Sequence, residues 1–407
     1  MKLFLVKLSK INASSWIIIV GIFITSIAKC MVIPFFAVYL VQHMHFSVAA
    51  AGVAIAARTF GQRGLVLIGG PFVDWLGPKT VIGVGLLLMA ISYLFTAYSQ
   101  SISAIVFWTL ALGLGGAFYT PAIKSAMVNE TSYSERIFIL SLRSTALNVG
   151  SALGPVLGAM IFIISPKMIF ITTAIIIFFL ALISQLVVKI PSNKDKKLAL
   201  KLSDVYILFK NPAAWKLIIF TVLFYTFFIQ LELTYPIFAA ETFHAKTVGY
   251  LFLLNAIIII AFQMPLSNWI TKASIDKVFL IGMSTLGLGL LVTTFSYLSL
   301  SVFYIAIAVF SFGEILILPK LDAEVSLSVS QNVVGTAFGV LGGASAVGAI
   351  IGGILGGNVF HAITKNFGVY YYWLSLGVVL ILITLLIAVM QYVKRINPLS
   401  QKFSREL

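Results

Sequence analysis

Long apolar runs separated by short polar connections dominate the pattern of hydrophobic and polar positions along this 407-residue chain. About twelve runs reach the length of a membrane-spanning helix, roughly 20 residues. They show no strict alternation of the kind that marks transmembrane β-strands. The runs cover roughly residues 16–41, 47–69, 79–99, 103–126, 138–163, 168–188, 215–239, 248–270, 277–298, 301–323, 334–358 and 369–393. The pattern therefore predicts an all-α membrane protein with twelve transmembrane helices.

Residues 189–214 form the one long polar stretch inside the chain and divide the expected helices into two groups of six. We expect an N-terminal six-helix bundle over residues 1–188 and a C-terminal bundle over residues 215–407. Between them, the spacing of apolar residues in LALKLSDVYILFK, residues 198–210, is amphipathic. Such spacing favours a cytoplasmic linker that includes a helix lying on the membrane surface.

Small residues and prolines recur in the two groups at a constant offset of 198 positions. Gly115, Pro121, Gly150, Gly154 and Gly158 correspond to Gly313, Pro319, Gly348, Gly352 and Gly356, and Lys79 corresponds to Lys277. An offset that holds across two helices and their connections indicates an internal duplication. Two parallel repeats predict pseudo-twofold symmetry about the membrane normal.

Composition and charge agree with a membrane protein and predict its orientation. The chain is 60% hydrophobic and 10% charged, which leaves too little polar surface for a water-soluble globule. Lysine and arginine gather at both ends and in the linker, whereas the opposite loops carry only Lys167, Lys246 and Lys365. Both termini should therefore be cytoplasmic. The net charge of +15 follows from this topology, so anionic lipid and not nucleic acid is the expected partner.

Enzymatic and metal chemistry find no support in the sequence. The single cysteine, Cys30, can form no intramolecular disulfide, and the histidines lack metal-ligand spacing. The chain also lacks a Walker loop, a His-Glu-x-x-His motif and a nucleophile elbow. We expect neither an enzyme nor a bound cofactor.

Ionisable residues inside the apolar runs carry the functional signal, because a charge within a membrane is costly unless it pairs or lines an aqueous cavity. These residues are Lys29, Arg58, Arg63, Arg143, Glu232 and Glu314. The excess of cations over carboxylates leaves positive charge that an anionic substrate can neutralise. The alternative is structural ion pairing, such as Lys29 with Glu232 or Arg58 with Glu314.

The expected roles follow from chemistry and position. Candidates for substrate binding are cations and hydrogen-bonding groups: Lys29, Arg58, Arg143, Tyr119 and Asn255. Single polar residues such as Tyr119 and Asn255 can instead bridge helices. Glu314 and Glu232 are candidates for proton coupling, because a carboxyl in a cavity can load and release a proton as the cavity opens to each side.

Three segments and the duplication resemble the major facilitator superfamily. AARTFGQRGLVLIGGPFVDWLGPK (residues 56–79), LGLGGAFYTPAIKSA (112–126) and GSALGPVLGA (150–159) are similar to its drug:proton antiporter branch, in particular to twelve-helix bacterial multidrug-resistance efflux proteins. The resemblance covers nearly the whole chain. It implies two pseudo-symmetric six-helix bundles, a monomer in the bacterial inner membrane, a small-molecule substrate and transport driven by the proton gradient.

The stretch GGPFVDWLGPKT, residues 69–80, resembles the superfamily's loop between helices two and three. The matching residues are Gly70, Asp74, Gly77 and Lys79, and the resemblance implies a cytoplasmic gate. Trp75 and Pro78 stand where the family has cations, so Asp74 needs another partner. The alternative is that Asp74 only caps the turn into the third helix. The second-half counterpart, NWITKASIDK, keeps only Lys277, so any such gate should act mainly from the first half.

The segment Gly150–Ala159 resembles the antiporter signature of the fifth helix, with Gly154 and Pro155 at its centre. Small residues at four-residue spacing let helices approach closely, and Pro155 removes one backbone donor. The resemblance associates this segment with export. Lys124 and Asp322, near the repeat-related prolines, are further gate candidates.

The predicted function is a proton-coupled exporter that works by alternating access around a cationic cavity. Its charge favours an anionic or amphiphilic substrate, such as a polycarboxylate siderophore or a drug. The same fold could instead run as an importer or facilitator of a small anionic metabolite. A receptor or scaffold without transport would not need buried charge in both halves.

Overall fold

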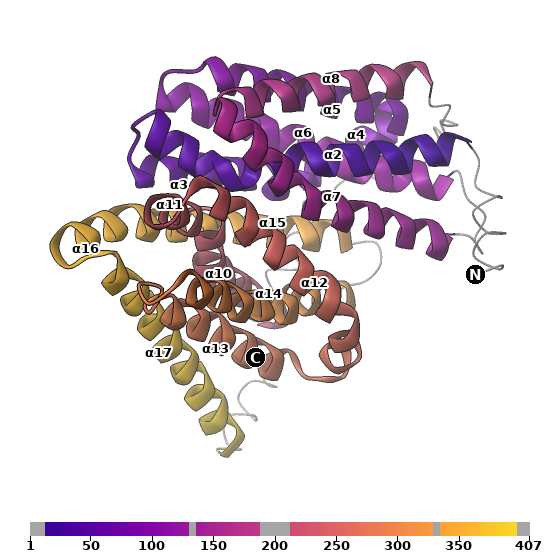
Figure 1. The fold of residues 1–407 in the computed structure, drawn as a ribbon. Helices are drawn as coiled ribbons and strands as arrows, with labels where there is room; N and C mark the ends of the chain where they lie inside the picture. The colour runs from indigo at the N-terminus through magenta and orange to yellow at the C-terminus, as the bar shows by residue number, and fades with distance from the viewer. Residues whose placement is uncertain (1–12, 130–135, 188–211, 329–333, 397–407) are drawn as a thin grey trace. The chain divides into compact units, whose positions relative to one another are not determined.

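The computed structural model describes residues 13–129, 136–187, 212–328 and 334–396, and the regular elements among them are helices (Figure 1). In these residues, eleven helices are long and apolar enough to cross a membrane. The remaining expected span, residues 47–69, folds as α3 (Val48–Thr59), the π-helical turn η2 (Phe60–Gly64) and α4 (Val66–Leu76). The predicted all-α membrane class is confirmed, and each of the expected spans corresponds to helical structure.

Contacts divide the chain into two compact units, Met1–Ala256 with Val325–Asn358, and Ile257–Glu324 with Val359–Leu407. The first unit holds α3, η2 and α4 with α2 (Ala13–Val38), η1 (Tyr39–His43), α5 (Pro78–Tyr98), α6 (Ile102–Asn129), α7 (Arg136–Ile164), α8 (Met168–Leu186), α10 (Pro212–Phe228), η3 (Ile229–Leu231), α11 (Thr234–Thr242), the start of α12 (Ala245–Lys272), α15 (Val334–Ile354) and most of η4 (Leu355–Val359). The second holds the rest of α12, α13 (Ile275–Thr293), most of α14 (Leu300–Ser328), α16 (Phe360–Phe367) and α17 (Val369–Ile396).

These units differ from the division expected from the sequence. They place α10, α11 and α15 with the helices of residues 1–188. The expected linker lies outside the described residues except for its last few positions. The division into bundles of residues 1–188 and 215–407 stays a prediction.

A sharp turn joins α4 to α5. Gly77 lies between the two helices with φ +80°, a backbone conformation that glycine adopts without steric strain. Pro78 occupies the first turn of α5, where its missing N–H would have no helical partner. The proline that departs from the family pattern therefore has a local structural role.

Duplicated glycines lie at equivalent helix contacts in the first unit. A Cβ added at Gly150 of α7 would lie 2.6 Å from the Cβ of Ser26 on α2. At the repeat-related Gly348 of α15, it would lie 2.8 Å from the Cβ of Tyr225 on α10. Only glycine lets these helix backbones come so close. The fifth and eleventh spans thus pack on the first and seventh in the same way.

The same correspondence holds for the fourth and tenth spans, each within its own unit. A Cβ at Gly115 of α6 would lie 2.8 Å from the carbonyl oxygen of Gly85 on α5. A Cβ at Gly313 of α14 would lie 2.7 Å from the carbonyl oxygen of Gly282 on α13. The predicted duplication therefore extends to helix packing.

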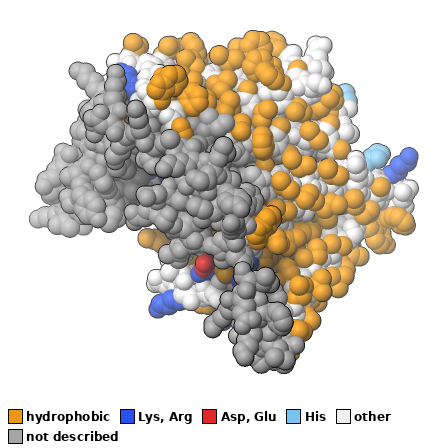
Figure 2. All heavy atoms as spheres, turned by 180° about the vertical axis from the view of Figure 1, so that it is seen from behind, with side chains coloured by type: hydrophobic (Ala, Val, Ile, Leu, Met, Phe, Trp, Pro, Cys, Tyr) orange, Lys and Arg blue, Asp and Glu red, His pale blue; other side chains and the backbone are white. Residues whose placement is uncertain are grey.

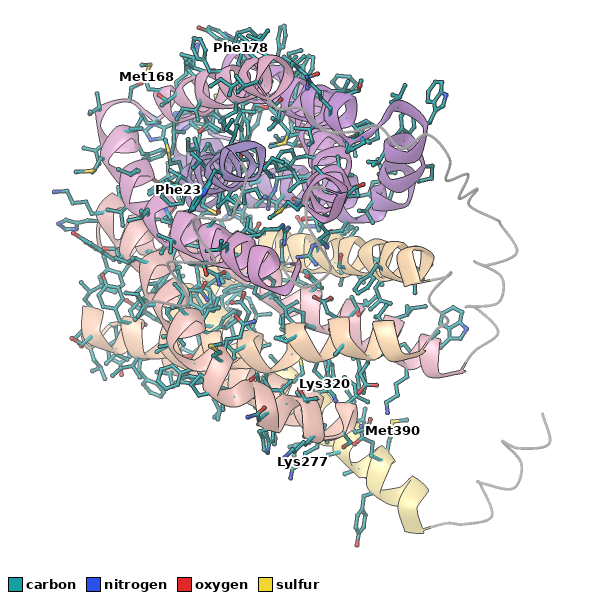
Figure 3. The ribbon with its side chains drawn as sticks, turned by 90° about the vertical axis from the view of Figure 1, so that its right-hand side faces the viewer. Phe23, Met168, Phe178, Lys277, Lys320 and Met390 are labelled. Atoms are coloured by element: carbon teal, nitrogen blue, oxygen red, sulfur yellow. The ribbon has the colours of Figure 1, made fainter. Side chains whose placement is uncertain are left out.

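The described surface is largely apolar. Hydrophobic side chains cover most of the described part of the face in Figure 2. Met168 and Phe178 project from α8 and are 45% and 44% exposed (Figure 3). An apolar surface of this extent requires lipid and not water as its solvent.

We expect Gly150→Leu to lower thermal stability, because its side chain must displace Ser26 on the facing helix. Overpacking of this kind costs about 1–3 kcal/mol. The repeat-related Gly348→Leu should act in the same direction. Gly343→Leu is the matched control, since a Cβ there meets no atom within 4 Å. Thermal unfolding of the detergent-solubilised proteins tests this, and equal unfolding temperatures for all three variants would contradict it.

Candidate functional site

A cavity of about 220 Å³ lies among helices of the first unit. Its walls come from α2, η2, the end of α3, α5, α6 and α7. It brings together the predicted residues Lys29, Arg58, Arg143 and Tyr119. We call it the cationic cavity. The remaining substrate-binding candidate, Asn255, is buried on α12 and is not part of this lining.

Lys29 and Tyr119 form one wall of the cationic cavity. The Lys29 ammonium lies 5.2 Å from the centroid of the Tyr119 ring, within the range of a cation–π contact. The Tyr119 hydroxyl donates to the Thr25 hydroxyl at 3.4 Å, and Thr25 donates to the Gly21 carbonyl at 2.6 Å. Thr25 and Lys29 are four residues apart on α2 and so lie on one helix face. This arrangement holds the tyrosine beside the lysine.

Arg143 contributes a second cation from α7. It is half-buried, and its Nε is buried without a hydrogen-bond partner among the described residues. A buried donor left unpaired costs about 1–3 kcal/mol. An anion in the cavity would supply the missing acceptor.

Arg58 contributes the third cation and has a partner. Its guanidinium Nη2 donates to Glu232 Oε2 in an ion pair whose side chains are 15% and 22% exposed. The pair links α3, from the first group of six expected spans, to the break between η3 and α11, from the second. It differs from the alternative of Lys29 with Glu232, which is wrong for these residues. Arg58 and Glu314 belong to different units, so that pairing stays a prediction.

The break after α10 positions Glu232. The helix tightens into the 3₁₀ turn η3, Glu232 follows it, and α11 begins at Thr234. Gln230 is fully buried here, donates to the Gly352 carbonyl at 2.9 Å, and accepts from the Thr234 hydroxyl at 2.8 Å. Short 3₁₀ segments inside long helices often mark functional hinges.

Sequence reasoning missed several polar residues at this site. Thr25 and Gln62 line the cationic cavity, and Gln230 supports the helix break beside Glu232. A signal was present, because each is a polar residue inside an apolar run and close in sequence to a charged one. Arg63 was counted among the deep cations, but it is exposed and its guanidinium carbon lies 4.9 Å from the ring centroid of Tyr225. It is not part of the cavity lining.

The predicted proton-coupling residues lie in different units. Glu232 belongs to the first unit and adjoins the cationic cavity through Arg58. Glu314 is half-buried on α14 in the second unit. Across the described residues, no three His, Cys, Asp or Glu side chains group as metal ligands.

The predicted gate loop is only partly described. Gly70 and Asp74 lie within α4, but the side chain of Asp74 is outside the described part of the structure. Gly77 is the N-cap residue of α5, and a capping role for the Asp74 side chain stays a prediction. The Lys79 carbonyl accepts from Gln185 Nε2 at 2.8 Å, which ties the start of α5 to α8.

The other gate candidates lie on three helices. Gly154 and Pro155 are buried on α7, and a Cβ added at Gly249 of α12 would lie 3.1 Å from the Pro155 carbonyl oxygen. The antiporter-like segment therefore packs closely on the eighth expected span. Lys124 on α6 and Asp322 on α14 are exposed.

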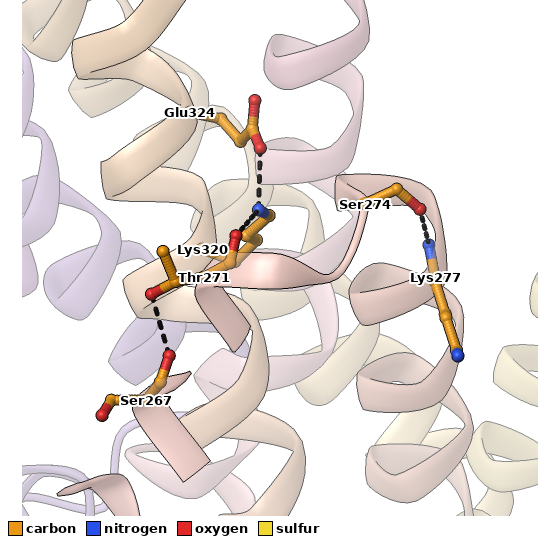
Figure 4. A network of polar contacts seen from close by, with 6 residues as sticks. All are labelled: Ser267, Thr271, Ser274, Lys277, Lys320 and Glu324. Carbon is orange, nitrogen blue, oxygen red and sulfur yellow. Dashed lines mark hydrogen bonds and ion pairs between the residues drawn. The ribbon is translucent and has the colours of Figure 1, made fainter. Parts of the chain in front are cut away.

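The second unit has a polar tie that the sequence did not predict (Figure 4). Lys320 of α14 is only 4% exposed, and its ammonium lies 2.9 Å from Glu324 Oε1. It also donates to the Thr271 carbonyl at 3.4 Å, at the C-terminal end of α12 where positive charge is stabilising. The turn between α12 and α13, the repeat-related counterpart of the Gly77 turn, is thereby anchored from α14.

Comparisons with known proteins agree on the family. A model of the Major Facilitator Superfamily matches residues 18–246 and 231–406. The chain is 25% identical over 370 residues to a Na(+), Li(+), K(+)/H(+) antiporter of Planococcus maritimus, covering 82% of this chain and 86% of that protein. It is 22% identical over 367 residues to the multidrug resistance protein MdtH of Aeromonas salmonicida (strain A449), covering 90% of each. The structure of the nucleoside transporter NupG matches with a TM-score of 0.78 at 16% identity, covering 93% of this chain and 99% of that one, and shows the shared fold.

We expect Glu232→Gln to destabilise the protein more than the double variant Arg58→Gln/Glu232→Gln. The single change leaves the Arg58 charge without its partner, whereas the double change removes both charges. Breaking a buried pair costs about 3–5 kcal/mol, and the partial exposure of this pair reduces that cost. Thermal unfolding of the three proteins in one detergent measures the coupling. A double variant no more stable than Glu232→Gln would contradict the expectation.

Proposed function

This chain belongs to the Major Facilitator Superfamily, and we propose that it is a proton-coupled exporter of anionic, amphiphilic organic molecules. Members of this superfamily are transporters and not enzymes, and this chain is similar to multidrug efflux proteins. We place it as a monomer in a bacterial inner membrane with both termini cytoplasmic. The proton gradient supplies the energy, without a cofactor.

The cationic cavity is the observation that carries the proposal. Lys29, Arg58 and Arg143 converge on it from three helices, and only Arg58 has a carboxylate partner there among the described residues. Charge left unneutralised in an apolar bundle is costly, so the cavity favours an anionic ligand. The unpaired Arg143 Nε supports the same conclusion.

The ion pair between Arg58 and Glu232 supports exchange of substrate for protons. It ties α3 to the helix break at η3. A proton on Glu232 removes one of the charges, and an anion at Arg58 competes for the other. Either ligand alone therefore releases the tie, whereas the empty protein stays held. An antiporter requires this rule, because its binding site must switch between the two sides of the membrane only when substrate or proton is bound.

The relatives favour export. One is named as a cation/proton antiporter and another as a multidrug resistance protein. The close packing of Pro155 against Gly249 fits the antiporter-like segment of α7. These relatives are not named for siderophores, so the proposal stays with the chemical class of an anionic amphiphile.

Proton-coupled uptake of an anion is the second candidate function. It is favoured because the anion and Glu232 would both bind Arg58. An anion that engages Arg58 leaves Glu232 without its cation, which favours protonation of Glu232. If both ligands then cross together, the protein is a cotransporter. The direction of proton movement separates the two candidates.

We use inside-out vesicles with an acidic interior and add an anionic amphiphile outside. We expect the proton gradient to drive the amphiphile into the vesicles while protons leave them. Arg143→Gln should reduce this transport by roughly 10- to 100-fold, the effect of removing one hydrogen bond to a charged group. An interior pH indicator and labelled substrate measure both fluxes. Protons and substrate that move in the same direction would favour uptake, and transport unaffected by Arg143→Gln would contradict the site.

A further inference from the structure

A second, apolar cavity adjoins the cationic cavity in the first unit. It has a volume of about 330 Å³ and lies between α2, α5, α6 and α8. We call it the apolar groove. Val20 of α2 and Ile183 of α8 line it and are 47% and 44% exposed, so the groove opens between these helices on the apolar surface. Lys79 is the charged residue in its lining.

A thin partition separates the two cavities. Thr25, Tyr119 and Ile123 line both of them. The hydroxyl groups of Thr25 and Tyr119 meet across this wall at 3.4 Å, a long hydrogen bond that one side-chain rotation breaks. Thr25, Tyr119 and Ile123 therefore stand between the two cavities.

One face of α2 connects the groove to the cations. Gly21, Thr25 and Lys29 are spaced four residues apart, and they lie respectively in the groove, in the partition and in the cationic cavity. From Gly21 to Lys29 the helix rises about 12 Å. A ligand along this face would meet an apolar surface first and positive charge next.

We infer that the two cavities form one composite site, which holds the head of an anionic amphiphile in the cationic cavity and its alkyl tail in the apolar groove. The inference deepens and rests on the proposed function. The α2 face changes from apolar at Gly21 to positively charged at Lys29, which matches such a ligand. Its tail would lie beside Gly21 and its head beside Lys29 and Arg143. Ligand sites typically measure roughly 300–1,000 Å³, so the 220 Å³ cavity is small on its own and the joined site fits.

Gly21 offers a direct way to fill the groove. A Cβ added there meets no atom within 4 Å, so a leucine side chain enters open space. Leucine also has a higher helix propensity than glycine, so α2 should be preserved. Gly343→Leu on α15 is the matched control, because its Cβ position is equally open and it lines neither cavity.

The test uses the full-length protein in lipid nanodiscs, with dodecanoate and butyrate as probes. In the native protein, affinity should rise by about fourfold for each methylene that the groove buries. Gly21→Leu should lower dodecanoate affinity at least tenfold and leave butyrate affinity unchanged. The control variant Gly343→Leu should not lower dodecanoate affinity. Arg143→Gln should weaken both probes.

Tail position is read from Trp16, which lines the groove. Bromine at the end of 12-bromododecanoate should quench its fluorescence, and Trp16→Phe, Gly21→Leu and empty nanodiscs should lack that signal. Butyrate binding that depends on Arg143, together with dodecanoate binding indifferent to Gly21→Leu, would overturn the composite site alone. If neither dodecanoate nor butyrate binds, the proposed anionic substrate is overturned. Brominated phospholipid tests whether lipid occupies the groove instead. If it quenches Trp16 fluorescence and dodecanoate does not relieve that quenching, the groove binds lipid and the inference is overturned.

Discussion

The cost of holding positive charge inside an apolar helix bundle is the constraint on which this structure depends. Lys29, Arg58 and Arg143 converge within the first unit, where water is scarce and unpaired charge is costly. The protein meets that cost in different ways. Arg58 pairs with Glu232, Lys29 lies over the Tyr119 ring, and Arg143 keeps a buried nitrogen without a partner among the described residues. The remaining positive charge is the basis of the proposed anion site.

The internal duplication supplies a scaffold but not a duplicated chemistry. Glycine contacts recur between α2 and α7 and between α10 and α15, so both repeats use the same close packing. The polar residues at these contacts differ. The first repeat carries lysine and arginine in a cavity, whereas Gln230 and Glu232 stand at a helix break in the second. Conserving small residues preserves helix spacing, and substitution elsewhere gives each repeat its own role.

The turns between helices show the same division of roles. The turn after α4 depends on Gly77 and Pro78, which fix its backbone geometry. Its counterpart after α12 has lost the sequence motif but is held by Lys320, which contacts the Thr271 carbonyl and Glu324. The sequence indicated a gate mainly in the first half, and it could not show that a lysine on α14 reaches this turn. Two different chemistries thus stabilise equivalent turns.

Hydrophobic periodicity and run length were sufficient for the membrane class and the helix positions, and recurring glycines and prolines were sufficient for the duplication, because each depends on residues close together in the chain or at a constant offset. They also identified Lys29, Arg58, Arg143 and Tyr119, since charged and polar groups are conspicuous in apolar runs. Only the tertiary structure decided that Arg58 pairs with Glu232, 174 residues away, and that Thr25 and Tyr119 separate two cavities. The reason is physical: sequence spacing sets the face of a helix on which a residue lies, but helix rotation and packing decide which other face it meets.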